Sequence, residues 1–395
     1  DSLVAPDVLA QAVHDQHGAA GGQRQVGAPF PPVQREAVMA GQSLLGAGVW
    51  DGPRPVFRPG TPAVPTTMTP AMLESFPAFN PEVRLQPPPL ERWRRGTGTD
   101  VAFVHVLDSG RPGPVAMVVA LVHGNELCGA IALDGLLGRS LKPLRGRLVL
   151  AFANVEAYGR FNALTPFASR CVDEDMNRVW DEAVLRGPRD SVELRRAREL
   201  APFVDAADVL LDLHSMQEPG APALTICGMT DKSVPLARAL GQPETLLVDT
   251  GHAAGLRMID RGSFSDPRSP RQAVLVECGA HWEPASATMA TDVTLRFLRH
   301  LGMIDDAWMA ASPRLPTPAR QRLVRVGEGV TAASPDFRFL LPTHHLKLIP
   351  AAGTPLAEDG ARRWVTPHDD CVLIMPSRRA GVAGQTMVRL GRYED

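Results

Sequence analysis

The sequence has few cysteines, and their arrangement excludes two kinds of protein. Five cysteines are scattered over 395 residues, their number is odd, and none stands in a CxxC pair. A small domain stapled by disulfides needs an even, closely spaced set, and a cysteine zinc site needs paired ligands. We therefore expect reduced thiols and a cytoplasmic protein.

The chain also lacks a long apolar run and an excess of basic residues. No stretch approaches the roughly 18 consecutive apolar residues of a membrane-spanning helix. The first residues, DSLVAPDVLAQAVHDQHGAAGG, lack the basic-then-apolar order of a secretory signal. The formal net charge is −2, which predicts no binding to nucleic acid or to an anionic membrane. Small molecules are the expected partners, and a homo-oligomer is left open.

What the sequence does contain is a regular alternation of strand-like and helical runs. The strand candidates are VAFVHVL (101–107), VAMVVALV (115–122), RLVLAFA (147–153), DVLLDLH (208–214), PALTIC (222–227) and AVLVEC (273–278). Helices are expected at 126–139, 191–204, 231–240 and 285–301. The order predicts an α/β fold with a mixed, largely parallel sheet flanked by helices.

Composition divides the chain into four segments. Residues 1–66, rich in Gly, Ala, Pro and Gln, predict an irregular N-terminal arm with short helices near DVLAQAV and VQREAVMAGQSLL. Residues 67–311 form the predicted α/β domain, and the proline-bearing residues 312–321 form a linker. Residues 322–395 carry short runs such as FRFLLP, RRWVTP and DCVLIMP between Gly, Pro and Asp, which predict a small all-β domain.

Three of the apolar strands end in residues that can bind a metal or move a proton. His123 follows the run at 115–122, with Glu126 three positions later. His214 ends a second run, and Glu277 ends a third. Sites of open α/β sheets lie outside the carboxyl ends of the strands, and two histidines, a glutamate and a water are a known zinc set. Each coincidence is weak alone, but together they favour a metal site.

The neighbours of these residues have expected roles as well. Asn125 is a good N-cap for the next helix, whose first turn would contain Glu126. Asp212 lies two positions before His214 and therefore on the same face of its strand, where it can orient an imidazole or simply cap the sheet edge. His281 follows Glu277 by four and is the other histidine expected to approach the site.

A second group of chemically useful residues lies in the stretch 154–180. It contains Arg160, Arg170, Asn177 and Arg178. Arginine forks bind carboxylates through two hydrogen bonds and can polarise a carbonyl. A solvated turn with local ion pairs is the alternative interpretation, but the length and position of the stretch favour a functional one.

The combination resembles the succinylglutamate desuccinylase and aspartoacylase family, whose members are zinc amidohydrolases related to zinc carboxypeptidases. The matching pieces, in the family's order, are HGNE (123–126), SRCVDEDMNR (169–178), DLHS (212–215) and VECG (276–279). The similarity extends from about residue 78 to residue 300, and a small β domain after it is also similar. The arm before residue 66 has no counterpart.

The resemblance implies a set of roles for residues of this chain. One zinc ion per chain would be bound by His123, Glu126 and His214. Glu277 would be the general base, and Arg170 would steady the scissile carbonyl oxygen. Asn177 and Arg178 match the pair that receives the substrate carboxylate.

Two features of the family have no clear match. The family reads an acidic side chain with an arginine before the catalytic glutamate, and here Arg261, Arg268 and Arg271 all qualify; we take Arg268 as the candidate. A tyrosine from the β domain contributes in some members, whereas this chain has only Tyr158 and Tyr393.

The predicted function is zinc-dependent hydrolysis of the amide bond of a small N-acyl amino acid, by a metal-activated water with a glutamate as general base. Two alternative functions are compatible with the same residues. A zinc carboxypeptidase acting on peptides would use the same core, and a non-catalytic zinc-dependent binding protein would keep the scaffold. An intact Glu277 argues against the binding protein, because a pure binder needs no base beside the metal.

Overall fold

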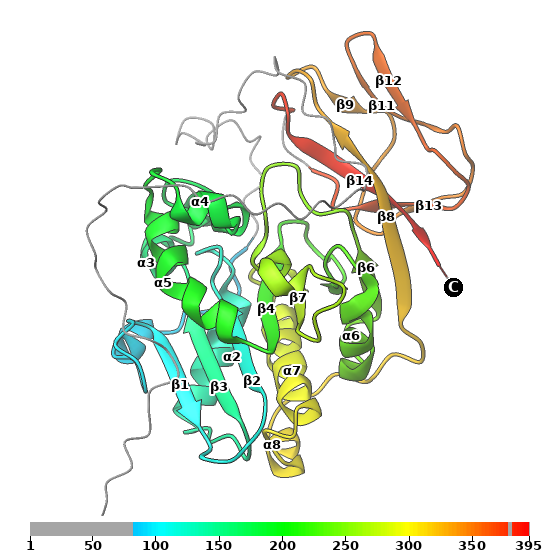
Figure 1. Cartoon of the computed structure of the whole chain (residues 1–395). Coiled ribbons are helices and arrows are strands. Elements are labelled where there is room, and N and C mark those ends of the chain that lie inside the picture. The colour runs from blue at the N-terminus through cyan, green and yellow to red at the C-terminus, as the bar shows by residue number, and fades with distance from the viewer. Residues whose placement is uncertain (1–81, 378–380, 395) are drawn as a thin grey trace, which may run out of the picture. The chain divides into compact units, whose positions relative to one another are not determined.

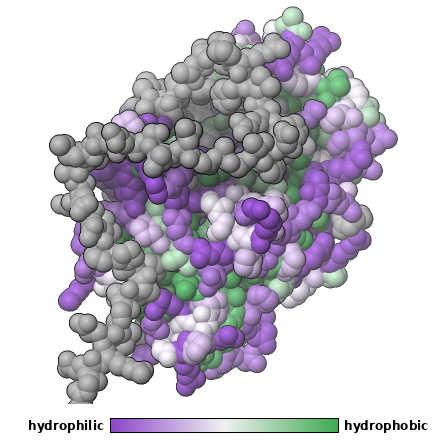
Figure 2. Space-filling model, in the orientation of Figure 1, coloured by the Kyte–Doolittle hydropathy of each residue, from purple (hydrophilic) through white to green (hydrophobic). Residues whose placement is uncertain are grey.

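The computed structural model describes residues 82–377 and 381–394, all within one compact unit. The predictions for the arm at residues 1–66 lie outside this range. No helix of the described part is long and apolar enough to cross a membrane. The described surface in the view of Figure 2 is largely hydrophilic, with apolar residues showing between the polar ones.

An eleven-stranded mixed sheet runs through the molecule (Figure 1). Its strands lie in the order β1-β3-β2-β4-β7-β5-β6-β8-β14-β13-β10. The first seven are β1 (Val104–Asp108), β2 (Val115–Ala120), β3 (Arg147–Phe152), β4 (Val209–Met216), β5 (Leu224–Ile226), β6 (Thr245–Val248) and β7 (Gln272–Ala280). The predicted fold class is confirmed.

Parallel pairing at the centre of the sheet determines where the functional residues meet. β2 pairs in parallel with both β3 and β4, and β4 pairs in parallel with β7. These strands are buried on both faces, which explains their nearly continuous apolar sequences. Because parallel strands point the same way, the residues that follow β2 and those at the ends of β4 and β7 lie at one edge of the sheet.

Helices cover both faces of this sheet. The larger ones are α2 (Leu127–Gly138), α5 (Val192–Ala206), α6 (Val234–Leu240) and α7 (Pro284–His300); the short ones are α3 (Val155–Gly159), α4 (Glu182–Arg186) and α8 (Asp306–Ala310). Single 3₁₀ turns occur at Leu90–Trp93, Pro166–Ser169, Met176–Arg178, Asp231–Ser233, Met258–Asp260 and Gly262–Phe264. α2, α6 and α7 share one core with alternate residues of β2, while α5 contacts β2 from the opposite side of the sheet (Figure 1).

The residues after the predicted linker extend the main sheet. They form β8 (Arg322–Thr331), β9 (Arg338–Phe339), β10 (Leu348–Ile349), β11 (Pro355–Asp359), β12 (Arg362–Val365), β13 (Cys371–Ile374) and β14 (Thr386–Tyr393). β8 pairs with β6 and β14, while β12, β11 and β9 form a separate three-stranded sheet. This region has its own apolar cluster around Leu356, Leu373 and Val388. A domain boundary at 312–321 stays a prediction.

The sequence patterns located the long elements but not all of the short ones. The strand candidates at 101–107, 115–122, 147–153, 208–214, 222–227 and 273–278 correspond to strands, and the four predicted helices are present within a few residues. β6, β8 and β11 were not predicted. β6 has only four residues, and the apolar residues of β8 (RLVRVGEGVT) are interrupted by Arg, Gly and Glu without strict alternation, so neither presents a strong periodic signal.

Glu193 anchors the loop at 170–178 to α5. The N-cap of this helix is Ser191, which accepts a hydrogen bond from Leu194 N at 3.0 Å. The buried Glu193 carboxylate instead accepts backbone N–H groups from Val172 at 2.6 Å, Asp173 at 3.0 Å and Glu174 at 3.2 Å. A helix face thus positions the loop that carries the candidate substrate-binding residues.

We expect Glu193→Ala to destabilise the protein by about 2–4 kcal/mol, because three backbone donors lose their acceptor. Urea denaturation measures this effect. Glu199→Ala, at an exposed position of the same helix, is the control and should cost under about 1 kcal/mol. Equal midpoints for the two variants would contradict the anchoring role.

Candidate active site

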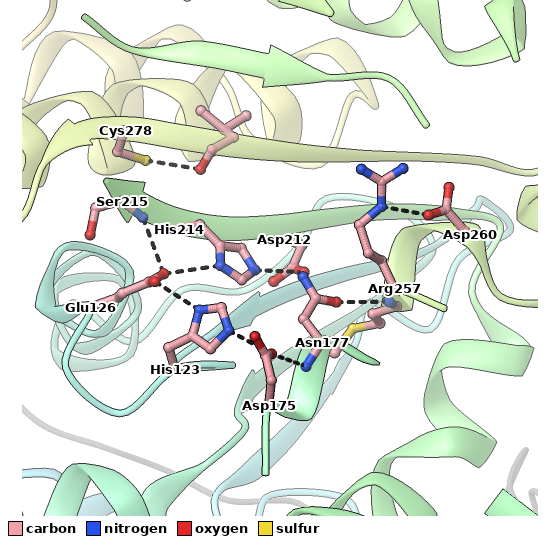
Figure 3. Close-up of polar contacts among 12 residues, drawn as sticks. His123, Glu126, Asp175, Asn177, Asp212, His214, Ser215, Arg257, Asp260 and Cys278 are labelled. Carbon is pink, nitrogen blue, oxygen red and sulfur yellow. Dashed lines mark hydrogen bonds and ion pairs between the residues drawn. The ribbon is translucent and has the colours of Figure 1, made fainter. Parts of the chain in front are cut away.

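His123, Glu126 and His214 form the one group among residues 82–377 and 381–394 that can hold a metal ion (Figure 3). One ligand atom from each lies within 4.8 Å of the others, and all three residues are buried. His123 Nδ1 is 2.7 Å from Glu126 Oε1, and His214 Nδ1 is 3.0 Å from Glu126 Oε2. The carboxylate therefore lies between the two imidazoles.

The local backbone explains how these side chains converge. After β2 the chain turns at Leu121, a buried residue with φ 63°, a costly conformation for a leucine. α2 begins at Leu127 with Glu126 at its N-cap, so the predicted capping role of Asn125 is wrong. The Glu126 side chain makes no capping hydrogen bond and instead accepts from Ser215 N at 3.1 Å. β4 thus fixes the carboxylate as well as supplying His214.

Each histidine has a second carboxylate on its far nitrogen. His123 Nε2 is 2.9 Å from Asp175 Oδ1, and His214 Nε2 is 2.9 Å from Asp212 Oδ2. Such carboxylates orient an imidazole and keep its other nitrogen directed at a metal. The predicted orienting position of Asp212 agrees with this contact, whereas Asp175 was not singled out, although it lies in the quoted DEDMNR stretch.

The charges of this cluster are strongly coupled. Burial opposes ionisation of Glu126, but His123 and His214 outweigh it and hold the pKa of this carboxyl well below its usual range. Burial likewise opposes a charge on His214, but Asp212 and Glu126 raise its pKa well above the usual value. The site therefore favours a cation among its buried carboxylates, which suits a divalent metal.

Glu277 lies beside His214 on the neighbouring strand. The two residues are Cα partners in the parallel pairing of β4 with β7. Burial, together with Glu126 and Asp212, outweighs His214 and Arg170 and raises the pKa of Glu277 to about 8. Its buried Oε2 atom has no hydrogen-bond partner among the described residues. A carboxyl group whose pKa lies near neutral pH can both accept and release a proton, so Glu277 is a candidate for proton transfer.

Arg170 contacts the same cluster. Its Nη2 donates to Asp175 Oδ2 at 3.1 Å and lies 2.9 Å from His123 Nε2, while Nη1 is 3.4 Å from Glu126 Oε1. Burial alone would lower the pKa of Arg170, but Asp175 and Glu126 raise it above its usual value. A fixed positive charge therefore lies directly against the candidate metal ligands.

Asn177 and Arg178 lie next to Asp175. Asn177 is buried, and its Oδ1 accepts from Met258 N at 3.0 Å. Arg178 donates to its neighbour's carbonyl, Asn177 O, at 2.7 Å. No carboxylate in the described part of the chain forms an ion pair with Arg178. Its guanidinium thus keeps free donors for an anion.

The three arginines considered as readers of the substrate side chain are not brought to this cluster. Arg261 bonds Asp205 and Glu182, and Arg271 donates to Asp205 O. The Arg268 side chain is 89% exposed and pairs with Asp266. Its assignment as a substrate-binding residue stays a prediction without a supporting contact.

The two tyrosines are engaged elsewhere, whereas His281 does approach the site. Tyr158 donates to Pro88 O at 2.6 Å, and the Arg322 guanidinium lies 3.4 Å from the Tyr393 ring centroid. His281 Nδ1 is 2.7 Å from the hydroxyl of Ser215, the residue after His214. Burial lowers the pKa of His281 to about 3, so its imidazole is neutral at pH 7.

The chain has recognisable relatives. Residues 112–301 match the family model of the succinylglutamate desuccinylase/aspartoacylase catalytic domain. No curated protein matches the chain.

Solved structures share the fold. A succinylglutamate desuccinylase from Vibrio parahaemolyticus is 18% identical with a TM-score of 0.53, over 72% of this chain and 82% of its own. One from Chromobacterium violaceum is 19% identical with a TM-score of 0.53, over 75% and 89%. The product-bound ectoine utilization protein EutE (DoeB) of Ruegeria pomeroyi is 14% identical with a TM-score of 0.50, over 74% and 89%. Such low identities establish a shared fold and leave the substrate open.

The family match covers β2 through α7 and so includes His123, Glu126, His214 and Glu277. The predicted family is confirmed. Residues 112–301 thus match the catalytic domain of the succinylglutamate desuccinylase/aspartoacylase family, and solved structures of that name share the fold.

Proposed function

We propose that the protein is a zinc-dependent amidohydrolase that removes the acyl group from a small N-acyl amino acid. The observation that carries this proposal is the position of Glu277, which lies one strand away from His214 and whose buried Oε2 atom has no hydrogen-bond partner in the described part of the chain. A base beside three metal-binding side chains is the arrangement that metal-assisted hydrolysis requires. The names of the similar proteins, succinylglutamate desuccinylase and aspartoacylase, also describe removal of an acyl group and so agree with this proposal.

The donor set fits zinc. Two imidazole nitrogens and one carboxylate are a common catalytic zinc set that leaves a position for water or substrate. Carboxylates on the far nitrogen of both histidines are the partners that zinc-binding imidazoles usually have. A zinc ion bound by His123, Glu126 and His214 would supply Lewis acidity, which activates water near neutral pH and polarises a carbonyl.

Side chains of the protein have the remaining roles in the proposed reaction. Glu277 accepts a proton from the attacking water and returns it to the leaving amine. The Arg170 guanidinium stabilises the negative charge that develops on the carbonyl oxygen. Arg178, with Asn177 beside it, receives the substrate's α-carboxylate through its free donors. We also assign the protein to the cytoplasm, in keeping with five scattered cysteines, odd in number and without a CxxC pair.

We expect His214→Ala to lose tightly bound zinc, falling from one ion per chain to nearly none, because the remaining two ligands cannot hold the ion. Metal analysis after gel filtration measures this. His344→Ala, which removes an exposed histidine, should keep the full zinc content. Full zinc content in His214→Ala would exclude His214 as a ligand.

We expect Glu277→Gln to keep its zinc and to lose about 100- to 10,000-fold in turnover, because a positioned proton-transfer group is worth that much. The assay is release of free amine from a panel of N-acyl amino acids by zinc-loaded protein. Asp306→Asn, at an exposed carboxylate, serves as the control. Near-native turnover in Glu277→Gln would exclude it as the base, and no hydrolysis of any panel member by the unaltered protein would refute the proposed function.

A further inference from the structure

The loop at 249–261 contains a buried arginine, Arg257, that is hydrogen-bonded to two carboxylates of the same loop. Arg257 Nη1 and Nη2 donate to the two oxygens of Asp249 at 2.7 Å each, and its Nε donates to Asp260 Oδ2 at 2.5 Å. All three side chains are at most 4% exposed. Arg257 is therefore already bound in the two-pronged way in which an arginine would bind a substrate carboxylate.

This loop is packed directly against the carboxylate-binding residues proposed above. Met258 N donates to Asn177 Oδ1 at 3.0 Å, and Leu256 O accepts from Trp180 N at 3.3 Å. Gly255 has φ +148°, and its backbone lies so close to Arg178 that a Cβ on residue 255 would be 2.1 Å from Arg178 O. The loop is therefore packed against both Asn177 and Arg178, and Figure 3 shows the hydrogen bond that joins Asn177 to it.

The C-terminal strand β14 adds one more guanidinium to this group. Arg389 Nη1 donates to Asp249 Oδ2 at 2.5 Å, and the Arg389 side chain is 17% exposed. The pairing of β14 with β8 is irregular between Arg389 and Gly391, and such a bulge redirects a side chain. Asp249 is thus shared between two arginines that are 132 positions apart along the chain.

The charges on this side of the site nearly balance. Three guanidiniums, Arg178, Arg257 and Arg389, face two carboxylates, Asp249 and Asp260. The neighbouring residues Asp175 and Arg170 form an ion pair, and Asp175 also attracts Arg178 without forming an ion pair with it, so four guanidiniums and three carboxylates are present in all. Burial and the nearby guanidiniums lower the pKa of His252 to about 3, so this histidine adds no charge at pH 7. A surplus of one positive charge remains, and Arg178 is the guanidinium of this group that forms no ion pair with a carboxylate of the described residues.

From this balance we infer that the site accepts one carboxylate on the Arg178 side, so that the substrate is an N-acyl derivative of an amino acid whose side chain is not acidic. This inference rests on the proposed function. Arg257 could bind a second substrate carboxylate, but its donors are already hydrogen-bonded to Asp249 and Asp260. Asp249 also binds Arg389. An acidic side chain would have to displace a buried carboxylate from its partners, which leaves a buried charge uncompensated.

Asparagine and aspartate form a matched pair for the first test, because they have nearly the same shape and differ by one charge. Calorimetric titration of the zinc-loaded protein with each free amino acid measures binding without any turnover. We expect asparagine to bind at least 10-fold more tightly. Equal or tighter binding of aspartate would overturn the inference, as would the absence of binding by both.

The corresponding substrates separate this inference from the proposed function. We expect kcat/KM for N-acetylasparagine to exceed that for N-acetylaspartate by at least 10-fold, mainly through KM. If neither is hydrolysed but asparagine binds more tightly, the proposed function fails and the selectivity stands. If N-acetylaspartate is hydrolysed as well as N-acetylasparagine, the proposed function stands and the selectivity fails.

Variants test the cause of the selectivity. Asp249→Asn removes the shared carboxylate, frees two guanidinium forks, and should shift the preference toward aspartate by at least 10-fold. Asp260→Asn removes a single partner of Arg257 and gives a second test if the first variant does not fold, as judged by circular dichroism. Asp306→Asn, at an exposed carboxylate that pairs with Arg299, is the matched control and should leave the preference unchanged. An unchanged preference in a folded Asp249→Asn or Asp260→Asn variant would contradict the charge-balance explanation.

Discussion

The rest of the structure depends on the parallel pairing of β2, β4 and β7. Parallel strands end at the same edge, so residues about 90 and 150 positions apart in sequence come together there without any further device. The register is equally important, because a slip of one residue would turn His214 or Glu277 to the opposite face. Apolar side chains on both faces of these strands hold that register, with α2 and α7 on one side and α5 on the other.

Buried charge is the cost of this arrangement, and the structure offsets it with a chain of partners. Glu126 lies between two imidazoles, and each imidazole has a further carboxylate behind it. Removing one member would leave its neighbour buried and uncompensated, which is far more costly than losing an exposed ion pair. The network thereby fixes the orientation of the three candidate metal ligands, and it creates a negative environment that suits a divalent cation.

The substrate side of the site is built by elements that lie far from the metal-binding motifs. Glu193 on α5 holds the loop of Arg170 through backbone hydrogen bonds, and Asp249 connects the loop at 249–261 with β14. The C-terminal strands are thus more than an appended domain, because they continue the sheet through β8 and contribute a charge beside the proposed substrate carboxylate. A common hydrolytic core combined with a different balance of charges around it is a simple way for one fold to change its substrate.

The sequence by itself determined the α/β class, the long central strands and the residues at their ends, because buried parallel strands have continuous apolar runs and their carboxyl ends carry the site. Through its family resemblance, the sequence also indicated that the motifs HGNE, DEDMNR, DLHS and VECG contribute to one site. Only the tertiary structure decided that Asp175 contacts His123, that Glu193 supports a loop instead of capping its helix, and that Arg257 and Arg389 share Asp249. These are single contacts between residues remote in sequence, with no periodic pattern, and an arginine that binds the chain's own carboxylate looks the same in a sequence as one that awaits a substrate.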